Sequence, residues 1–167
     1  MNAAREELLI KSWLSHDARW FNAVAREFGL EAANRLNQRA AREAGRVEAQ
    51  RARRHIGIDE VKSAEDCVRA LASLVALFGA PAGLLEYDAA VEDASSFTMR
   101  VRRCFAHDNV ARAGIASRYD CGIFARVQGW LEGLGLRHEV SPALEGCLMA
   151  QGLECTHKVR IQAGGAA

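Results

Sequence analysis

The spacing of apolar residues changes once along the chain, from a helical period to a strand period. Up to about residue 80, apolar residues recur every three to four positions, which is typical of amphipathic helices. After Pro81 they alternate with polar residues, which is typical of strands with one buried face. The pattern therefore predicts an α+β fold in which a helical N-terminal half packs on a small antiparallel sheet.

Capping and breaking residues divide the helical half into segments. In the first segment we expect Ser15 to cap a second helix and Gly29 to end it. The next segment is rich in alanine and is expected to end at Gly57. Its predicted buried face consists of Ala33, Leu36, Ala40, Ala44 and Val47. A third helix is expected to begin at Ser63, which opens a Ser-x-x-Asp capping pattern.

Two segments with strand periodicity flank the loop EDASS at residues 92–96 and predict an antiparallel hairpin. Apolar residues alternate with polar and charged ones on both sides of the loop. If Asp88 pairs with Arg100, the same register pairs Glu86 with Arg102. Opposite charges would then face each other on the solvent side of the sheet.

Beyond the hairpin the pattern predicts two helices and three short strands. The first helix lies near FAHDNVARAG, and the second begins at Cys121 with CGIFARVQGWLEGLG. The strand-like segments are RHEVSP, EGCLMA and CTHKVRI, and Gly152 is placed to turn the chain between the last two. We expect one domain over residues 1–167, with a helical subregion at 1–80 and an α+β, metal-binding subregion at 82–161.

The composition and the distribution of charge indicate a globular domain and argue against a nucleic-acid partner. The 167 residues are 50% hydrophobic and 26% charged, which is typical of a globular domain that buries a core. Residues 1–58 hold 11 Lys and Arg against 7 Asp and Glu, and the remainder holds 11 against 14. Neither part is strongly basic, so we expect no nucleic-acid partner.

The first residues and the longest uncharged segment argue against a secretory signal and a membrane span. Charged residues interrupt MNAAREELLIKSWLSHD before an apolar stretch develops. The longest uncharged segment, residues 70–85, has 16 residues and is broken by Gly79 and Pro81, which is too short to cross a bilayer. We expect a cytoplasmic protein without membrane contact, in which thiols stay reduced.

Three of the five cysteines lie in the C-terminal part of the chain, at Cys121, Cys147 and Cys155. Clustered cysteines in a reducing compartment favour metal binding or redox chemistry over disulfides. A helix start beside two strands could supply three ligands of a tetrahedral zinc site, and the helix N-terminus would lower the pKa of the Cys121 thiol. On spacing alone, buried structural cysteines explain the pattern equally well. Cys67, inside an apolar helix, is expected to belong to the core.

From Cys121 to Ile161 the chain resembles the C-terminal half of the 4-vinyl reductase domain. That domain occurs in effector-sensing modules of aromatic-responsive bacterial regulators and in proteins linked to bacteriochlorophyll synthesis. The matching features are Cys121, GWLEGLGL, HEV, Cys147 followed by Gly152, and Cys155 leading into THKVRI. The resemblance covers about a quarter of the chain. It implies a bound zinc, a nearby small-molecule pocket and, often, a dimer.

Over its full length the chain is more similar to an uncharacterised prokaryotic family. That family carries a helical block of the form HDARWF...EFGLEAANRLN before a similar cysteine region. The chain is also distantly similar to L-2-amino-thiazoline-4-carboxylate hydrolases. This second similarity implies an activity on a small heterocycle.

The 4-vinyl reductase resemblance implies a zinc site at the three clustered cysteines and leaves the fourth ligand open. The sensing modules complete the site with an acidic residue shortly before the second cysteine, and Glu145 is the nearest candidate here. We favour Cys104, at the end of the hairpin, because thiolate is the softer ligand, and His107 is a third candidate. Four thiolates could also hold an iron–sulfur cluster, but the spacing is not that of ferredoxins, so zinc is the expected metal.

Polar residues among aromatic ones in the helical block mark a second candidate site. His16, Asp17, Trp20 and Asn37 could face a small-molecule pocket. Asp17 is also explained as a first-turn residue and Trp20 as a core residue. Asn34 and Asn37 are unusual inside an Ala-rich helix, because Asn favours caps and turns. They either satisfy buried polar groups or face a ligand.

Two functions from different classes fit these residues. In the first, four protein ligands close the zinc site, which is then structural, and a small hydrophobic or aromatic molecule binds between helices and sheet. Tyr119 and Trp130 either line that cavity or pack in the core. In the second, the protein is a hydrolase that acts on a heterocycle or amide through a zinc-bound water or a cysteine thiolate. We favour the binding domain, because no general base is identifiable near the cysteines. The Ala-rich helices could form the interface of a homodimer.

Overall fold

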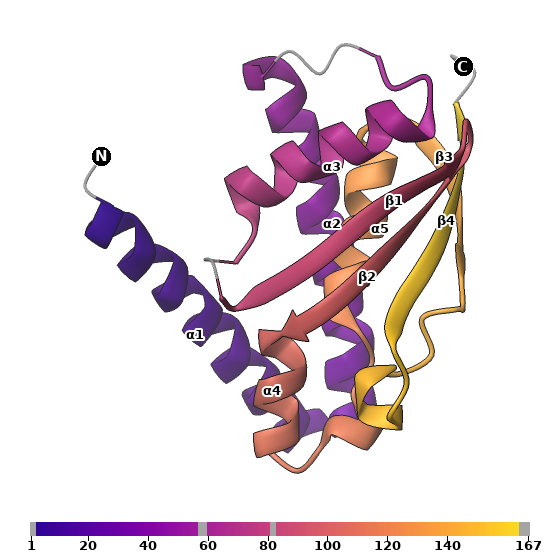
Figure 1. Ribbon diagram of the computed structural model, residues 1–167. Coiled ribbons are helices and arrows are strands. Elements are labelled where there is room, and N and C mark those ends of the chain that lie inside the picture. Colours follow the sequence, from indigo (N-terminus) through magenta and orange to yellow (C-terminus); the bar gives the residue numbers. More distant parts are fainter. Residues whose placement is uncertain (1–2, 57–59, 81–82, 164–167) are drawn as a thin grey trace.

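In the computed structural model, which describes residues 3–56, 60–80 and 83–163, α-helices pack on one four-stranded antiparallel sheet (Figure 1). The helices are α1 (Ala3–Phe28), α2 (Leu30–Ile56), α3 (Ala64–Phe78), α4 (Phe105–Arg112) and α5 (Gly122–Gly133). The strands are β1 (Leu85–Asp93), β2 (Ser96–Cys104), β3 (Leu136–Ser141) and β4 (Cys155–Ala163). Two short 3-10 turns are η1 (Ala116–Arg118) and η2 (Met149–Gln151). This mixture confirms the predicted α+β class.

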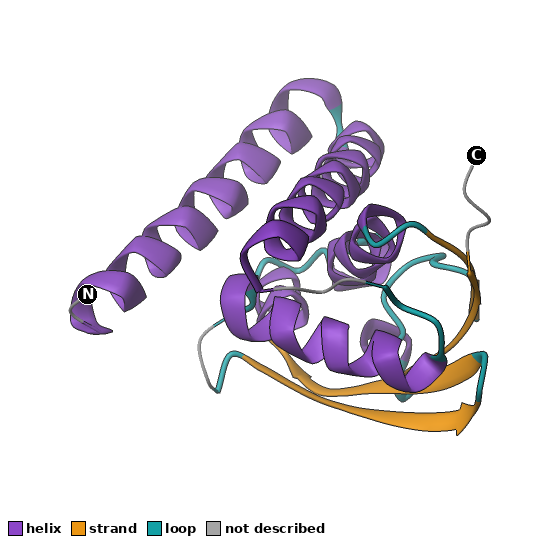
Figure 2. Ribbon diagram, turned by 90° about the horizontal axis from the view of Figure 1, so that it is seen from above, coloured by secondary structure: helices purple, strands orange, loops and turns teal. Residues whose placement is uncertain are grey.

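The sheet forms one layer and the long helices form the other (Figure 2). Its strand order is β1-β2-β4-β3, with every neighbouring pair antiparallel. The residues of β2 that face the helices are Phe97, Met99 and Val101, all buried. On the opposite face Arg100 pairs with Glu154, and Arg102 pairs with Asp88. One apolar and one charged face are the usual arrangement in an antiparallel sheet that is covered on one side.

Glycine sets the contact between α2 and α5. A Cβ atom at Gly129 would lie 2.0 Å from the Arg42 carbonyl oxygen, and one at Gly45 would lie 2.3 Å from the Arg126 carbonyl oxygen. Real side chains do not tolerate such distances, so the two backbones approach as closely as they do because both positions lack a side chain. This contact places α5 between α2 and the sheet, where its residues reach the interior of the molecule.

The predicted buried face of α2 is wrong because of the same contact. Leu36 and Val47 are 38% and 40% exposed, and only Ala33 of the predicted face is buried. The helix instead turns its smallest residues inward, including Gly45, Ala49 and Ala52. Close backbone packing against α5 thus outweighs burial of the larger apolar side chains.

The capping predictions have mixed outcomes. Helix α1 is continuous, and the Ser15 hydroxyl donates to the Lys11 carbonyl inside it, so the predicted break at Ser15 is wrong. Gly29, with φ of 87°, separates α1 from α2 as predicted. Ser63 caps α3 by accepting from the Asp66 N–H, which confirms that prediction. The predicted stop at Gly57 lies outside the described residues.

The hairpin is confirmed, with one difference in register. Asp88 pairs with Arg100 as predicted. A bulge between Glu86 and Tyr87 shifts the register, so Glu86 lies opposite Arg103 rather than the predicted Arg102. The predicted pairing of charged residues across the hairpin therefore fails only at the start of β1.

Of the three predicted C-terminal strands, two are confirmed. RHEVSP and CTHKVRI correspond to β3 and β4. EGCLMA is not a strand: it contains the start of η2, which ends at Gln151 and is followed by Gly152 with φ of 73°. Cys147 and Glu145 are consequently loop residues.

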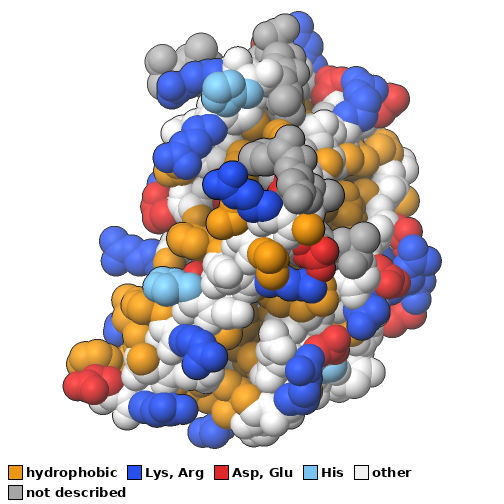
Figure 3. Space-filling view, turned by 90° about the vertical axis from the view of Figure 1, so that its left-hand side faces the viewer, with side chains coloured by type: hydrophobic (Ala, Val, Ile, Leu, Met, Phe, Trp, Pro, Cys, Tyr) orange, Lys and Arg blue, Asp and Glu red, His pale blue; other side chains and the backbone are white. Residues whose placement is uncertain are grey.

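Helix α1 packs on the rest of the molecule through its C-terminal half. There Phe21 and Val24 form a small buried cluster with Ala33, Val110 and Tyr119. The N-terminal half projects from the body (Figure 1), and Leu9 and Trp13 are 58% and 63% exposed. Apolar side chains therefore reach the surface on this side, between basic and acidic ones (Figure 3). Among the described residues, no helix combines the length and hydrophobicity that crossing a bilayer requires.

Candidate ligand cavity and thiol cluster

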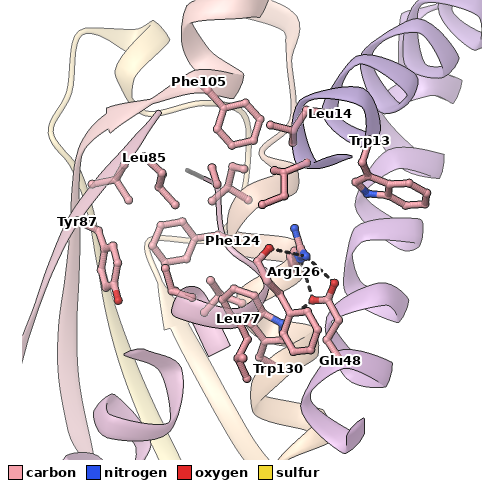
Figure 4. A pocket seen from close by; sticks show the side chains of 18 of the residues that line it. Trp13, Leu14, Glu48, Leu77, Leu85, Tyr87, Phe105, Phe124, Arg126 and Trp130 are labelled. Atoms are coloured by element: carbon pink, nitrogen blue, oxygen red, sulfur yellow. Dashed lines mark hydrogen bonds and ion pairs between the residues drawn. The ribbon is translucent and has the colours of Figure 1, made fainter. Parts of the chain in front are cut away.

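A large cavity lies where α1, α3 and α5 meet the hairpin (Figure 4). Its volume is about 460 Å³, which is within the range of small-molecule sites in proteins. Most of its lining is apolar. The apolar lining residues include Leu9, Trp13, Leu14, Val75, Leu77, Phe78, Leu85, Met99, Phe105, Ile123, Phe124, Val127 and Trp130. We call this space the apolar cavity.

The polar part of this lining consists of the Tyr87 side chain and one buried ion pair. The carboxylate of Glu48 on α2 accepts from Nε and Nη2 of Arg126 and from the indole N–H of Trp130, both on α5. The Trp130 bond is 2.8 Å long, and the Arg126 Nε bond is 2.9 Å long. Both charged side chains are largely buried, with 16% and 28% of their surface exposed. Buried charges of this kind need such partners, so the pair is fixed in one geometry.

A second cavity of about 180 Å³ adjoins the first and contains part of the predicted pocket. Asp17 and Asn37 line it. The Asp17 side chain is 58% exposed, and its partial burial raises the pKa of the carboxyl, an increase that the neighbouring His16 and Arg126 oppose. We call this space the polar cavity, since Asn22 and Asn109 also line it.

The other two predicted pocket residues lie elsewhere. The His16 side chain is 70% exposed and stacks on Trp13, with the two ring centroids 5.9 Å apart. Trp20 is 44% exposed and is not part of the polar cavity or the apolar cavity. The structure thus brings Asp17 and Asn37 together and leaves His16 and Trp20 on the outer side of α1.

The two asparagines of α2 have separate roles. The Asn34 side chain donates from Nδ2 to the Arg118 carbonyl at 2.7 Å, so it satisfies a buried polar group. The Asn37 amide packs against Gly122, where a Cβ atom would lie 2.6 Å from Nδ2. A hydrogen bond links Asn37 to the Tyr119 hydroxyl, which accepts from the Gly122 N–H at 3.3 Å. Asn37 therefore lines the polar cavity and also supports the start of α5.

Four cysteines line a third, much smaller cavity of about 20 Å³, which we call the thiol cluster. Its sulfur-bearing residues are Cys104 at the end of β2, Cys121 before α5, Cys147 in the loop before η2, and Cys155 at the start of β4. His107, Tyr119 and His157 also line it. A volume of this size holds about one water-sized atom. Cys67, in contrast, is fully buried in α3 and belongs to the core, as predicted.

Two helix N-termini point at the thiol cluster. Cys104 is the N-cap of α4 and Cys121 is the N-cap of α5, where the Phe124 N–H donates to the Cys121 sulfur at 3.5 Å. Burial nevertheless raises the pKa of Cys121 to about 11 and that of Cys155 to about 12, and the nearby thiols add to both increases. The predicted lowering of the Cys121 pKa is therefore wrong, because lost hydration outweighs the helix terminus.

The residues of the thiol cluster have the ligand chemistry that a zinc ion requires. Zinc binds thiolate and imidazole ligands in a tetrahedron, and four thiols from four segments surround a space for one atom. Among the described residues, no group of three such ligands is arranged so that it could already hold a metal ion. Zinc binding would require thiols to rotate about their Cα–Cβ bonds toward the centre. Glu145 is exposed and does not line the cluster, whereas Cys104 and His107 do.

Three residues of these sites were not among the predicted site residues. His157 is 2% exposed and lines the thiol cluster, and burial lowers its pKa, so its imidazole is neutral at physiological pH. It lies two residues after Cys155 on the same strand, and that spacing was the available signal. Glu48 and Arg126 lie 78 residues apart, and no local pattern connects them.

Most of the chain matches a protein-family model. A model described as a family of unknown function, DUF6125, matches residues 5–127, about three quarters of the chain. The chain belongs to the DUF6125 family. The matched residues include Glu48 and Arg126, whereas Cys147 and Cys155 follow them. No curated protein matches the chain.

Proposed function

We propose that this member of the DUF6125 family is a sensor-like domain that binds a small hydrophobic or aromatic molecule and is stabilised by one structural zinc ion. The observation that carries the binding function is the apolar cavity, which has the volume of a ligand site and a mostly apolar lining. The resemblance of residues 121–161 to the 4-vinyl reductase domain supports the same function.

The zinc part of the proposal rests on the thiol cluster. Zinc at Cys104, Cys121, Cys147 and Cys155 would have four protein ligands, which closes a tetrahedral site and makes it structural. Two helix N-termini favour the negative charge that four thiolates carry. The bound ion would hold the ends of β2, β4 and α5 and the loop before η2 at one point.

The hydrolase alternative has less support. The raised pKa values of Cys121 and Cys155 keep both thiols protonated at neutral pH, so neither is a thiolate nucleophile as it stands. A zinc ion closed by four cysteines leaves no position for a water molecule. We therefore rank this activity below small-molecule binding.

The homodimer and the cytoplasmic location stay predictions from the sequence. All five cysteines are free thiols in the structure.

Elemental analysis of freshly purified, reduced protein tests the zinc. We expect one zinc ion per chain in the wild type and in Glu145→Ala, because Glu145 is exposed and outside the thiol cluster. Cys104→Ser should lose most of the metal. We also expect its melting temperature to fall by about 4–8 °C, which corresponds to roughly 2 kcal/mol for a domain of this size.

Each outcome bears on a different claim. Full zinc content in Cys104→Ser would show a site without Cys104, and loss of zinc in Glu145→Ala would show that the carboxylate is the fourth ligand. A wild-type chain without metal would overturn the zinc and leave the four cysteines as core residues. None of these results decides whether the apolar cavity binds a ligand, which is tested separately.

A further inference from the structure

Arg126 lies at the boundary between the apolar cavity and the polar cavity. It lines both spaces, together with Leu14, Phe105 and Ile123. The two cavities are therefore neighbours that share this wall. A molecule in the apolar cavity that extends toward the polar cavity would meet the guanidinium there.

Hydrogen bonds from two of its three nitrogens hold the Arg126 guanidinium in place. Nε and Nη2 donate to the two carboxylate oxygens of Glu48, and Nη2 also donates to the Phe78 carbonyl at 3.0 Å. Within the described part of the chain, the hydrogen bonds of Arg126 do not use Nη1. In Figure 4 the guanidinium has Glu48 on one side and the apolar side chains of Leu14 and Phe105 on the other. Nη1 is thus a fixed donor available to a ligand.

The charges around Arg126 decide which ligand group would bind there. Glu48 already neutralises the guanidinium, and the Asp17 carboxyl of the polar cavity lies within electrostatic range of it. A ligand carboxylate would meet one cation between two acidic groups and would gain little net attraction. A neutral acceptor such as a carbonyl requires only the hydrogen bond and leaves the ion pair intact.

We propose that Arg126 anchors the ligand through Nη1, and that the site takes neutral apolar molecules with one hydrogen-bond acceptor rather than carboxylates or phosphates. This inference rests on the proposed small-molecule function and names the class of ligand. The apolar lining binds the body of the molecule, and the anchor fixes which end lies at the boundary. The Trp130 indole N–H shares the Glu48 carboxylate with Arg126, so its resonance reports on the anchor.

Three probes with the same bicyclic body test the anchor: naphthalene, 2-acetonaphthone, which adds a carbonyl, and 2-naphthoate, which adds a carboxylate. Each is titrated into the full-length, ¹⁵N-labelled protein while the Trp130 indole N–H resonance is followed. We expect 2-acetonaphthone to bind about tenfold more tightly than naphthalene, since a hydrogen bond from a charged donor contributes on that order. We expect 2-naphthoate to bind no more tightly than naphthalene.

Arg126→Lys separates the anchor from the ion pair. Lysine keeps a positive charge beside Glu48 but replaces the planar fork with a single ammonium group. The measured quantity is the ratio of the two affinities in the same variant: the advantage of 2-acetonaphthone over naphthalene should fall to about twofold or less. Arg69→Lys is the matched control, because Arg69 is exposed on α3. That variant should keep the full advantage.

Glu48→Gln tests the charge argument independently. The carboxamide has nearly the same shape and can still accept from Trp130, but the guanidinium loses its neutralising partner. We expect 2-naphthoate to bind this variant about tenfold more tightly than it binds the wild type. If Arg126→Lys does not fold, the titrations of the wild type and of Glu48→Gln with the three probes still test the anchor.

The outcomes distinguish the proposed small-molecule function from the proposed role of Arg126 as the anchor. If none of the probes binds the wild type, the small-molecule function is wrong and the anchor with it. Three results would overturn the anchor alone: no advantage for 2-acetonaphthone over naphthalene, an advantage that survives in Arg126→Lys, or tightest binding of 2-naphthoate to the wild type. An unchanged affinity of Glu48→Gln for 2-naphthoate would overturn the selection by charge.

Discussion

Asn34 shows how a single buried amide connects α2 to a distant segment. Its side chain is 5% exposed, and Nδ2 donates to the Arg118 carbonyl, while Oδ1 has no partner among the described residues. Asn34→Asp keeps the shape but places an oxygen opposite that carbonyl and buries a charge. We expect it to lower the free energy of unfolding by at least about 2 kcal/mol, measured by urea denaturation.

Two further variants serve as controls for the stability change in Asn34→Asp. Asn34→Ala removes the same hydrogen bond without adding a charge and should be less damaging, at about 1–2 kcal/mol. Gln50→Ala on the exposed surface of α2 should change stability by less than about 0.5 kcal/mol. Wild-type stability in Asn34→Asp would show that the bond to Arg118 is not formed in solution.

Single residues also show where prediction from the sequence ends. The spacing of Cys121, Cys147 and Cys155 and the resemblance it carries were enough to predict that they meet, and the structure places them around one small cavity. Polar residues among aromatic ones in the helical block predict that His16 and Trp20 face a pocket. They lie on the outer side of α1 instead, because the rotation of a helix is set by the surface it packs on rather than by its own sequence.

At the scale of elements, the contact between α2 and α5 should tolerate no added side chain. The Cβ atom in Gly129→Ala would lie 2.0 Å from the Arg42 carbonyl oxygen, so the helices must separate. Alanine improves helix propensity by about 1 kcal/mol, but overpacking typically costs about 1–3 kcal/mol. We expect a net loss of stability, measured as a lower midpoint in urea.

A second substitution on α5, Ala125→Gly, provides a comparison for Gly129→Ala. Ala125→Gly changes another buried position of α5 in the opposite sense, and it should lower stability by about 1 kcal/mol through propensity and lost packing. Gly129→Ala should also loosen the packing of Trp130, the next residue, and shift its indole N–H resonance, whereas a propensity effect alone would not. Gly129→Ala as stable as the wild type would mean that α2 and α5 lie farther apart in solution.

The elements that could be predicted are those whose pattern is local. The hairpin and the strands β3 and β4 follow from alternation, which depends on neighbouring residues only. The segment EGCLMA has a strand-like composition but forms a loop and part of η2, because Gly146 and Gly152 adopt positive φ values and bend the chain there. The rotation of α2 was predicted wrongly, because it depends on glycines of α5 that lie 80 and more residues away.

At the scale of the whole molecule, the thiol cluster and the apolar cavity share a wall. Val101, Ile123 and Phe124 line both spaces, from β2 and the first turn of α5. The Phe124 ring also packs against His157 of the thiol cluster, with ring centroids 3.9 Å apart. A metal ion that fixes the start of α5 would therefore also fix one side of the ligand cavity, although the two sites are separate.

This shared wall predicts that zinc and ligand bind cooperatively. Removing the metal with a chelator should weaken the binding of 2-acetonaphthone by about fivefold or more, the lower end of typical coupling between sites. Linkage requires the reverse effect to be equal, so 2-acetonaphthone should tighten zinc binding by the same factor. Both ratios are measured by titration, with circular dichroism to confirm that the metal-free chain stays folded. Glu145→Ala, which leaves the cluster intact, should show the wild-type ratios. A folded, metal-free chain that binds the probe with unchanged affinity would mean that the two cavities act independently, and the zinc would then support only the thiol-bearing segments themselves.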